Sequence, residues 1–131
     1  MNELYSLGIS EETIKCMLEV NPKINDLSVQ EIVFKENMLK ELDCTDNQVR
    51  NIISSNPMFL SNTTEEIVDV VMTLTNYGFT TLNILFDANP YIFNLDSDEI
   101  KEYIESRKNN GESLDDIVDD LDSNPYLFNE I

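Results

Sequence analysis

Apolar residues recur along this chain at intervals of three and four positions, in short segments separated by polar residues. One such segment carries Ile14, Met17 and Leu18, and another carries Val49, Ile52 and Ile53. This spacing places the apolar side chains on one face of a helix, and it continues from one end of the sequence to the other. The pattern predicts an all-α protein made of short amphipathic helices.

The dipeptide Asn-Pro punctuates these segments four times, and it contains the only prolines in the chain. The prolines are spaced by 35, 33 and 35 residues, a period typical of stacked helical repeats. We therefore predict a single helical-repeat domain, residues 1–131, with units of about 1–26, 27–60, 61–94 and 95–131. It would be a right- or left-handed solenoid of about 3.5 helix-pair repeats. The four dipeptides are Asn21-Pro22, Asn56-Pro57, Asn89-Pro90 and Asn124-Pro125.

Helix ends can be placed from residues that recur at fixed distances from each proline. A cap with a glutamate three positions later predicts a capping box at the start of the first helix of a repeat; these pairs are Ser28 and Glu31, Thr63 and Glu66, Asp96 and Glu99. Glycine or aspartate then predicts a left-handed end to that helix, at Gly8, Asp43, Gly78 and Gly111. The second helix follows a further cap, at Ser10, Thr45, Thr80 or Ser113. Roughly seven main helices result, with short 3₁₀ turns after the prolines.

The order Leu-x-x-Leu-Gly-Ile-Ser, an apolar helix, Asn-Pro-x-apolar and Ser-x-x-Glu-Ile resembles the repeat of the mitochondrial transcription termination factor (mTERF) family. The best matches are the segments 4–24, 39–59 and 74–92. The resemblance implies a curved solenoid of short helical units. It also implies binding of double-stranded nucleic acid through a basic concave surface.

The charge of the chain departs from that family function. The sequence has 8 Lys and Arg against 26 Asp and Glu, and residues 51–93 contain no base. Such a surface repels the phosphate backbone over most of its area. A nucleic-acid-binding or transcription-regulatory role of the mTERF kind is the alternative, and it would use a local basic patch in the first 50 residues: Lys15, Lys23, Lys35, Lys40 and Arg50.

The last predicted helix concentrates acidic residues, namely Asp115, Asp116, Asp119, Asp120 and Asp122. Asp120 stands where the earlier repeats have Met17, Ile52 and Leu85, and Arg107 likewise replaces a leucine. One interpretation is a solubilising cap at the end of the solenoid. A second is a docking site for a basic protein. A divalent-metal site is a weak third, because the spacing and glycine of a calcium loop are missing.

The aromatic residues that follow the prolines are predicted to fall into a buried group and an exposed group. Phe59, Phe93 and Phe128 recur once per unit, as core residues do, whereas Tyr91 and Tyr126 directly follow a proline and are expected to be exposed. Both cysteines, Cys16 and Cys44, are predicted to be small core hydrophobes.

Catalysis is not expected, because the chain has no histidine, no Gly-rich phosphate loop and no paired-cysteine metal motif. No catalytic residue, cofactor or metal ligand is predicted. No apolar run is long enough to span a membrane, and the N-terminus resembles neither a signal peptide nor a transit peptide, so a cytoplasmic location is expected. The main hypothesis is a non-enzymatic interaction module that binds a basic protein, including as a nucleic-acid mimic that inhibits a nucleic-acid-binding protein or defence nuclease. A purely structural or assembly subunit is a further possibility.

Overall fold

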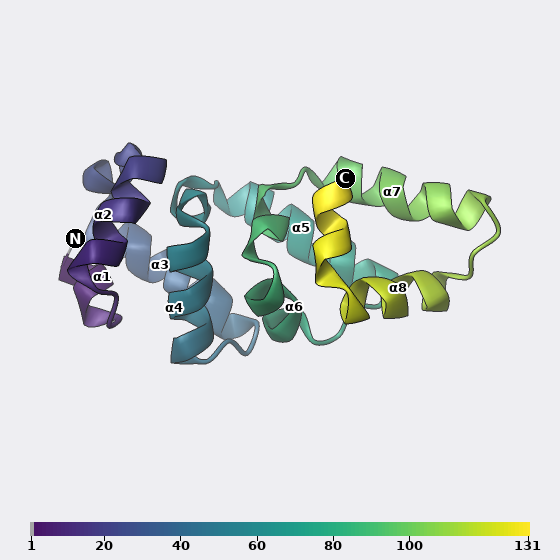
Figure 1. The fold of residues 1–131 in the computed structure, drawn as a ribbon, viewed down its shortest axis with the longest axis horizontal. Coiled ribbons are helices and arrows are strands. Elements are labelled where there is room, and N and C mark those ends of the chain that lie inside the picture. Colours follow the sequence, from purple (N-terminus) through teal and green to yellow (C-terminus); the bar gives the residue numbers. More distant parts are fainter. Residues whose placement is uncertain (1) are drawn as a thin grey trace. The chain divides into compact units, whose positions relative to one another are not determined.

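The computed structural model describes residues 2–131, and the regular structure in that range is entirely helical. Residues 2–131 form eight α-helices, α1–α8, and one of four short 3₁₀ helices, η1–η4, follows each successive pair of them (Figure 1). A 3₁₀ helix begins at each proline, as predicted. The expected number of about seven main helices is one too few, because the tail of the first helix, Asn2–Ser6, is an α-helix in its own right.

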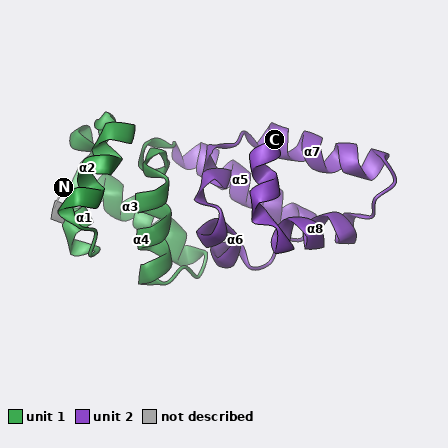
Figure 2. Ribbon diagram, in the orientation of Figure 1, with its two compact units in different colours: residues 1–62 green, residues 63–131 purple. Residues whose placement is uncertain are grey.

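The chain divides into two compact units, Met1–Asn62 and Thr63–Ile131 (Figure 2). The boundary lies two residues beyond the predicted end of the second repeat at residue 60. The single-domain assignment stays a prediction. Unit 1 contains α1 (Asn2–Ser6), α2 (Glu11–Val20), η1 (Pro22–Asp26), α3 (Val29–Glu41), α4 (Asp46–Ser55) and η2 (Pro57–Ser61). Unit 2 contains α5 (Thr64–Tyr77), α6 (Leu82–Ala88), η3 (Pro90–Asn94), α7 (Ser97–Asn109), α8 (Leu114–Ser123) and η4 (Pro125–Glu130).

Helix starts follow the predicted caps with one exception. Capping boxes begin α3, α5 and α7, and Ser10, Thr45 and Ser113 each accept a hydrogen bond from a backbone N–H of the following turn. The cap expected at Thr80 is wrong, since α6 begins at Leu82 and the preceding Thr81 makes no side-chain cap bond. This repeat is two residues shorter before its proline, and α6 has seven residues where the other second helices have ten.

The ends of the first helices adopt the predicted left-handed conformation. Gly78 caps α5 with φ of 104°, and Asp43 follows α3 with φ of 69°. Aspartate tolerates this region better than most residues with a β-carbon, because its short side chain bonds locally. Gly8 and Gly111 have positive φ as well.

Each unit has a core of aliphatic and phenylalanine side chains from its helices. Ile32 and Leu39 of α3 and Ile67 and Leu74 of α5 are 0–1% exposed. One of the two cysteine assignments is wrong. Cys16 is exposed on α2, whereas Cys44 is buried as predicted.

The Asn-Pro asparagines do more than end a helix. Asn21 Nδ2 donates to the carbonyl of Pro57 at 3.0 Å and to Ser61 Oγ at 2.7 Å, which joins the first repeat of unit 1 to the second. Asn89 Nδ2 makes the same pair of bonds in unit 2, to the Pro125 carbonyl at 2.9 Å and Asn129 Oδ1 at 3.0 Å. Both asparagines are buried, so their amides fix the register between neighbouring repeats.

Candidate partner-binding surface

The predicted acidic cluster lies on α8, the last α-helix of unit 2. Asp115 and Asp116 occupy its first turn, where negative charge is favoured by the helix dipole. Asp119 and Asp122 follow at helical spacing, and all four side chains are exposed. Burial raises the pKa of Asp122, and the neighbouring charge of Asp119 raises it further. These four carboxylates form an anionic face of α8.

Asp120 differs from the other four because it is engaged inside the unit. Arg107 Nη2 of α7 donates to Asp120 Oδ2 at 2.9 Å and to Glu112 Oε1 at 2.6 Å, and Arg107 Nε donates to Glu112 Oε2 at 2.8 Å. The guanidinium carbon of Arg107 lies 5.7 Å from the ring centre of Tyr103. The Glu112 bonds, followed by that of Asp120, hold the pKa of Arg107 above its usual range, and the Arg107 bond lowers the pKa of Glu112. The sequence grouped Asp120 with the free acids because it did not reveal this partner.

The other two bases of unit 2 are also paired with carboxylates. Lys101 lies 3.9 Å from Asp98, and Lys108 lies 3.5 Å from Glu105. Residues 63–131 hold 16 acids and 3 bases, a formal net charge of −13, against 10 acids and 5 bases, or −5, in residues 1–62. Unit 2 is therefore strongly anionic, and each of its bases already has an acidic partner within the unit.

Two of the five bases proposed as nucleic-acid contacts have structural roles in unit 1. Arg50 Nε donates to the Leu7 carbonyl at 2.7 Å, and Lys35 donates to the carbonyls of Leu60 and Asn62. The remaining three, Lys15 on α2, Lys23 on η1 and Lys40 on α3, are exposed, and Lys40 Nζ lies 3.6 Å from Asp46 Oδ1. A basic surface built from the first 50 residues would thus rely mainly on three lysines.

The two tyrosines predicted to be exposed are exposed. Tyr91 is 51% and Tyr126 is 70% accessible, and each directly follows the proline that starts η3 or η4. The phenylalanines of the same segments, Phe93 and Phe128, are buried. Phe93 stacks on Phe86 with ring centres 3.9 Å apart, which confirms its predicted core role.

Two other kinds of site can be assessed from side-chain placement and helix length. Across residues 2–131, the acidic and cysteine side chains form no group of three or more that could hold a metal ion. Within the same range, no helix is both long enough and apolar enough to cross a lipid bilayer.

A family model described as mTERF matches residues 1–125 of the 131-residue chain. A search of curated protein sequences finds no match.

Proposed function

Because the chain belongs to the mTERF family of nucleic-acid-related helical-repeat proteins, we propose that it is a non-enzymatic module that binds a basic, nucleic-acid-binding protein. The observation that carries this proposal is the charge of unit 2. Its net formal charge is −13, and its three bases are paired with carboxylates of the same unit. The exposed face formed by Asp115, Asp116, Asp119 and Asp122 is the proposed contact.

An anionic surface of this density has two consequences. It speeds encounter with a basic partner and makes the complex sensitive to salt. It also carries the same sign of charge as a phosphate backbone. The protein would therefore repel nucleic acid and compete with it for the basic surface of such a partner. In that form it acts as a nucleic-acid mimic and inhibits its target.

The repeat architecture and the location complete the proposal. We propose that the helix pairs are the repeats of a right- or left-handed solenoid of about 3.5 repeats. We further propose a cytoplasmic location.

Direct binding of nucleic acid is the second candidate, because Lys15 and Lys23 are exposed within unit 1. A mobility-shift titration with duplex DNA and duplex RNA at low salt separates the two candidates. The main proposal expects no shift. A shift that weakens steeply with salt and is lost in Lys15→Gln/Lys23→Gln would establish the second candidate instead.

Affinity capture tests the main proposal. Tagged protein is incubated with cell lysate, bound proteins are released with a salt gradient, and the same is done with the variant Asp115→Asn/Asp116→Asn/Asp119→Asn/Asp122→Asn. We expect basic nucleic-acid-binding proteins from the wild type and a clear loss with the variant. Recovery of no basic protein, or equal recovery with both, would refute the proposal.

A further inference from the structure

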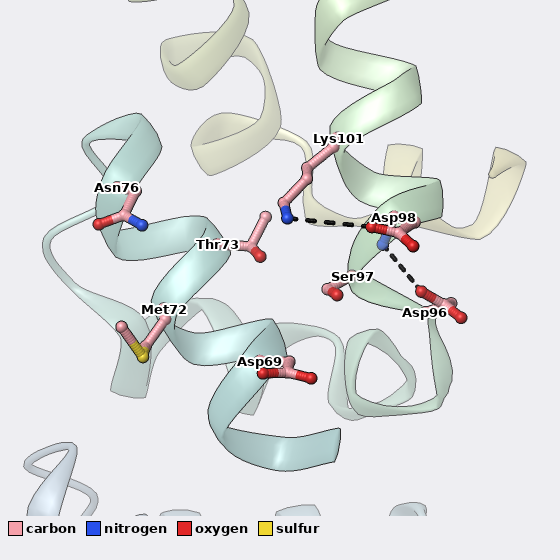
Figure 3. Close-up of a pocket in the computed structure, with 8 residues that line it drawn as sticks. All are labelled: Asp69, Met72, Thr73, Asn76, Asp96, Ser97, Asp98 and Lys101. Carbon is pink, nitrogen blue, oxygen red and sulfur yellow. Dashed lines mark hydrogen bonds and ion pairs between the residues drawn. The ribbon is translucent and has the colours of Figure 1, made fainter. Parts of the chain in front are cut away.

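Two carboxylates of unit 2 line a polar pocket between α5 and the start of α7, and both have partners there. Asp98 lies 3.9 Å from Lys101, and Asp96 accepts a hydrogen bond from the Asp98 N–H at 2.8 Å (Figure 3). Glu36 of α3, in unit 1, is in a different situation. Its side chain is 4% exposed, and within residues 2–131 its Oε2 is the one buried side-chain polar atom that has no hydrogen-bond partner.

Glu36 also faces a second carboxyl group. A hydrogen bond between its side chain and that of Glu3 joins α3 to α1, and the two helices are in contact. An ionised carboxylate has only acceptor oxygens, so two ionised carboxylates cannot form this bond. One proton must therefore lie between Glu3 and Glu36 while α1 is docked in this way.

The other charges around the pair do not take the place of that proton. Lys40 of α3 favours ionised Glu36, but it lies 3.6 Å from Asp46 of α4, whose charge has the opposite effect. Burial, followed by the hydrogen bond and the charge of Glu3, raises the pKa of Glu36 to about 7. The pair therefore keeps its proton below neutral pH and loses it as the pH rises through about 7.

The remaining attachments of α1 allow it to move separately from the rest of unit 1. With five residues, α1 is too short to persist as an isolated helix in water, so its helical structure depends on packing. Leu4, 0% exposed, anchors it in the core. Arg50 Nε holds the Leu7 carbonyl, directly after α1, at 2.7 Å. Residues 2–6 can thus leave α3 while the chain stays attached at Leu7.

We propose that Glu3 and Glu36 form a pH-sensitive latch that releases α1 from α3 when their shared proton is lost to solvent. In the docked arrangement, the lost proton would leave two like charges facing each other in a site with little access to water, which is unfavourable. Release of α1 returns both carboxylates to water and withdraws Leu4 from the core. The latch is independent of the proposed partner, and it names the helix that moves.

A tryptophan at position 5 provides a reporter on α1. The chain has no tryptophan, and Tyr5 is 47% exposed, so Tyr5→Trp introduces a single emitter at a position that accepts a larger side chain. Acrylamide quenching of its fluorescence is measured from about pH 5 to about pH 9. We expect the quenching constant to rise about twofold, as α1 unwinds, with a midpoint near pH 7.

Two further variants separate the latch from a general effect of pH. Tyr5→Trp/Glu36→Gln carries a neutral amide that donates to Glu3 at every pH, so its quenching should not change through this range. Tyr5→Trp/Glu41→Gln is the matched control, because it removes a carboxylate from an exposed position of the same helix. It should keep the full transition.

Hydrogen exchange of the wild-type protein, followed by mass spectrometry and corrected for the intrinsic pH dependence of exchange, tests the latch without any substitution. Peptides that cover α1 should lose protection as the pH rises through about 7, while peptides that cover α4 keep theirs. A quenching curve that is flat in Tyr5→Trp, or unchanged by Glu36→Gln, would overturn the latch. So would loss of protection in α4 together with α1, because the acid pair would then destabilise the whole unit and release no single helix.

Discussion

Corresponding positions of the second and fourth repeats carry different chemistry. In unit 1, Leu39 of α3 and Ile52 of α4 are 0% exposed. In unit 2, the same positions hold Arg107 and Asp120, which form an ion pair at 2.9 Å with side chains 18% and 39% exposed. One backbone pattern thus accommodates a buried apolar pair or a half-exposed polar pair. The polar pair gives the fourth repeat a charged, partly exposed surface at these positions.

The largest expected effect comes from truncating the apolar pair. Leu39→Ala should lower the free energy of unfolding by about 2–5 kcal/mol, because it leaves a cavity among fully buried side chains. Arg107→Ala, at the corresponding position, should cost about 1 kcal/mol or less, because its ion pairs are partly solvated. Urea unfolding followed by circular dichroism measures both, and similar losses for the two variants would abolish the distinction between the repeats.

Unit 1 also has a polar residue at a position that is apolar in other repeats, and this residue provides the next prediction. Glu36 takes the place of Val71 and Ile104, is 4% exposed, and has one oxygen, Oε2, without a hydrogen-bond partner within residues 2–131. Its pKa is raised to about 7, chiefly by burial and then by the side-chain hydrogen bond and the charge of Glu3 of α1. Within that net shift, Lys40 acts to lower the pKa and Asp46 acts to raise it.

The folded state therefore favours protonated Glu36. Its contribution to stability is fully present below pH 4.5, the usual pKa, and is lost as the pH rises through about 7. Unfolding free energy should fall by about 2 kcal/mol between pH 5 and 8. Glu36→Gln, which mimics the neutral acid, should remove most of that slope. A wild-type profile that is flat over this range would contradict the assignment.

The asparagine bonds give a third, smaller contrast. Asn89 joins two repeats through Pro125 and Asn129, whereas Asn124 is exposed and turns back to Asp120 of its own helix at 3.3 Å. Asn89→Ala should cost about 1–2 kcal/mol, because it leaves a part-buried proline carbonyl unsatisfied. Asn124→Ala should change stability by less than about 0.5 kcal/mol. Thermal unfolding of both variants measures the difference. An equal shift in Tm would show that the inter-repeat bonds of Asn89 stabilise the protein no more than the local bonds of Asn124 do.

Periodicity and capping were sufficient to predict most of the fold. Helix boundaries depend on local chemistry, such as the reciprocal bonds of Ser28 and Glu31, and this is visible in the sequence. The cap predicted at Thr80 was wrong because the shortened repeat moves the start of α6, and a cap residue alone does not reveal such a shift.

The candidate surface was less predictable than the fold. In the sequence, Arg107 and Asp120 each appeared as an isolated departure from the repeat. Arg107 is as far along the chain from Leu39 as Asp120 is from Ile52, and this equal sequence separation was a signal that the two residues form a pair. The burial of Thr73 and Glu36 depends on which face of their helix a neighbouring element covers. The hydrophobic pattern of the sequence does not specify this for a polar residue.

The smallest expected effect comes from converting the polar pair into the apolar one. Arg107→Leu with Asp120→Ile gives the fourth repeat the residues of the second. Replacing an ion pair by apolar residues of similar size is often neutral, because the desolvation cost and the ionic attraction disappear together. We expect a stability change within about 1 kcal/mol, a larger loss for Asp120→Ile alone, and a favourable coupling in the double-mutant cycle. The apolar pair would remain partly exposed in unit 2, so self-association in analytical ultracentrifugation should rise. A strongly destabilised double variant would instead mean that the Arg107 network with Glu112 and Tyr103 is essential to the unit, and not a polar surface on a repeat that folds without it.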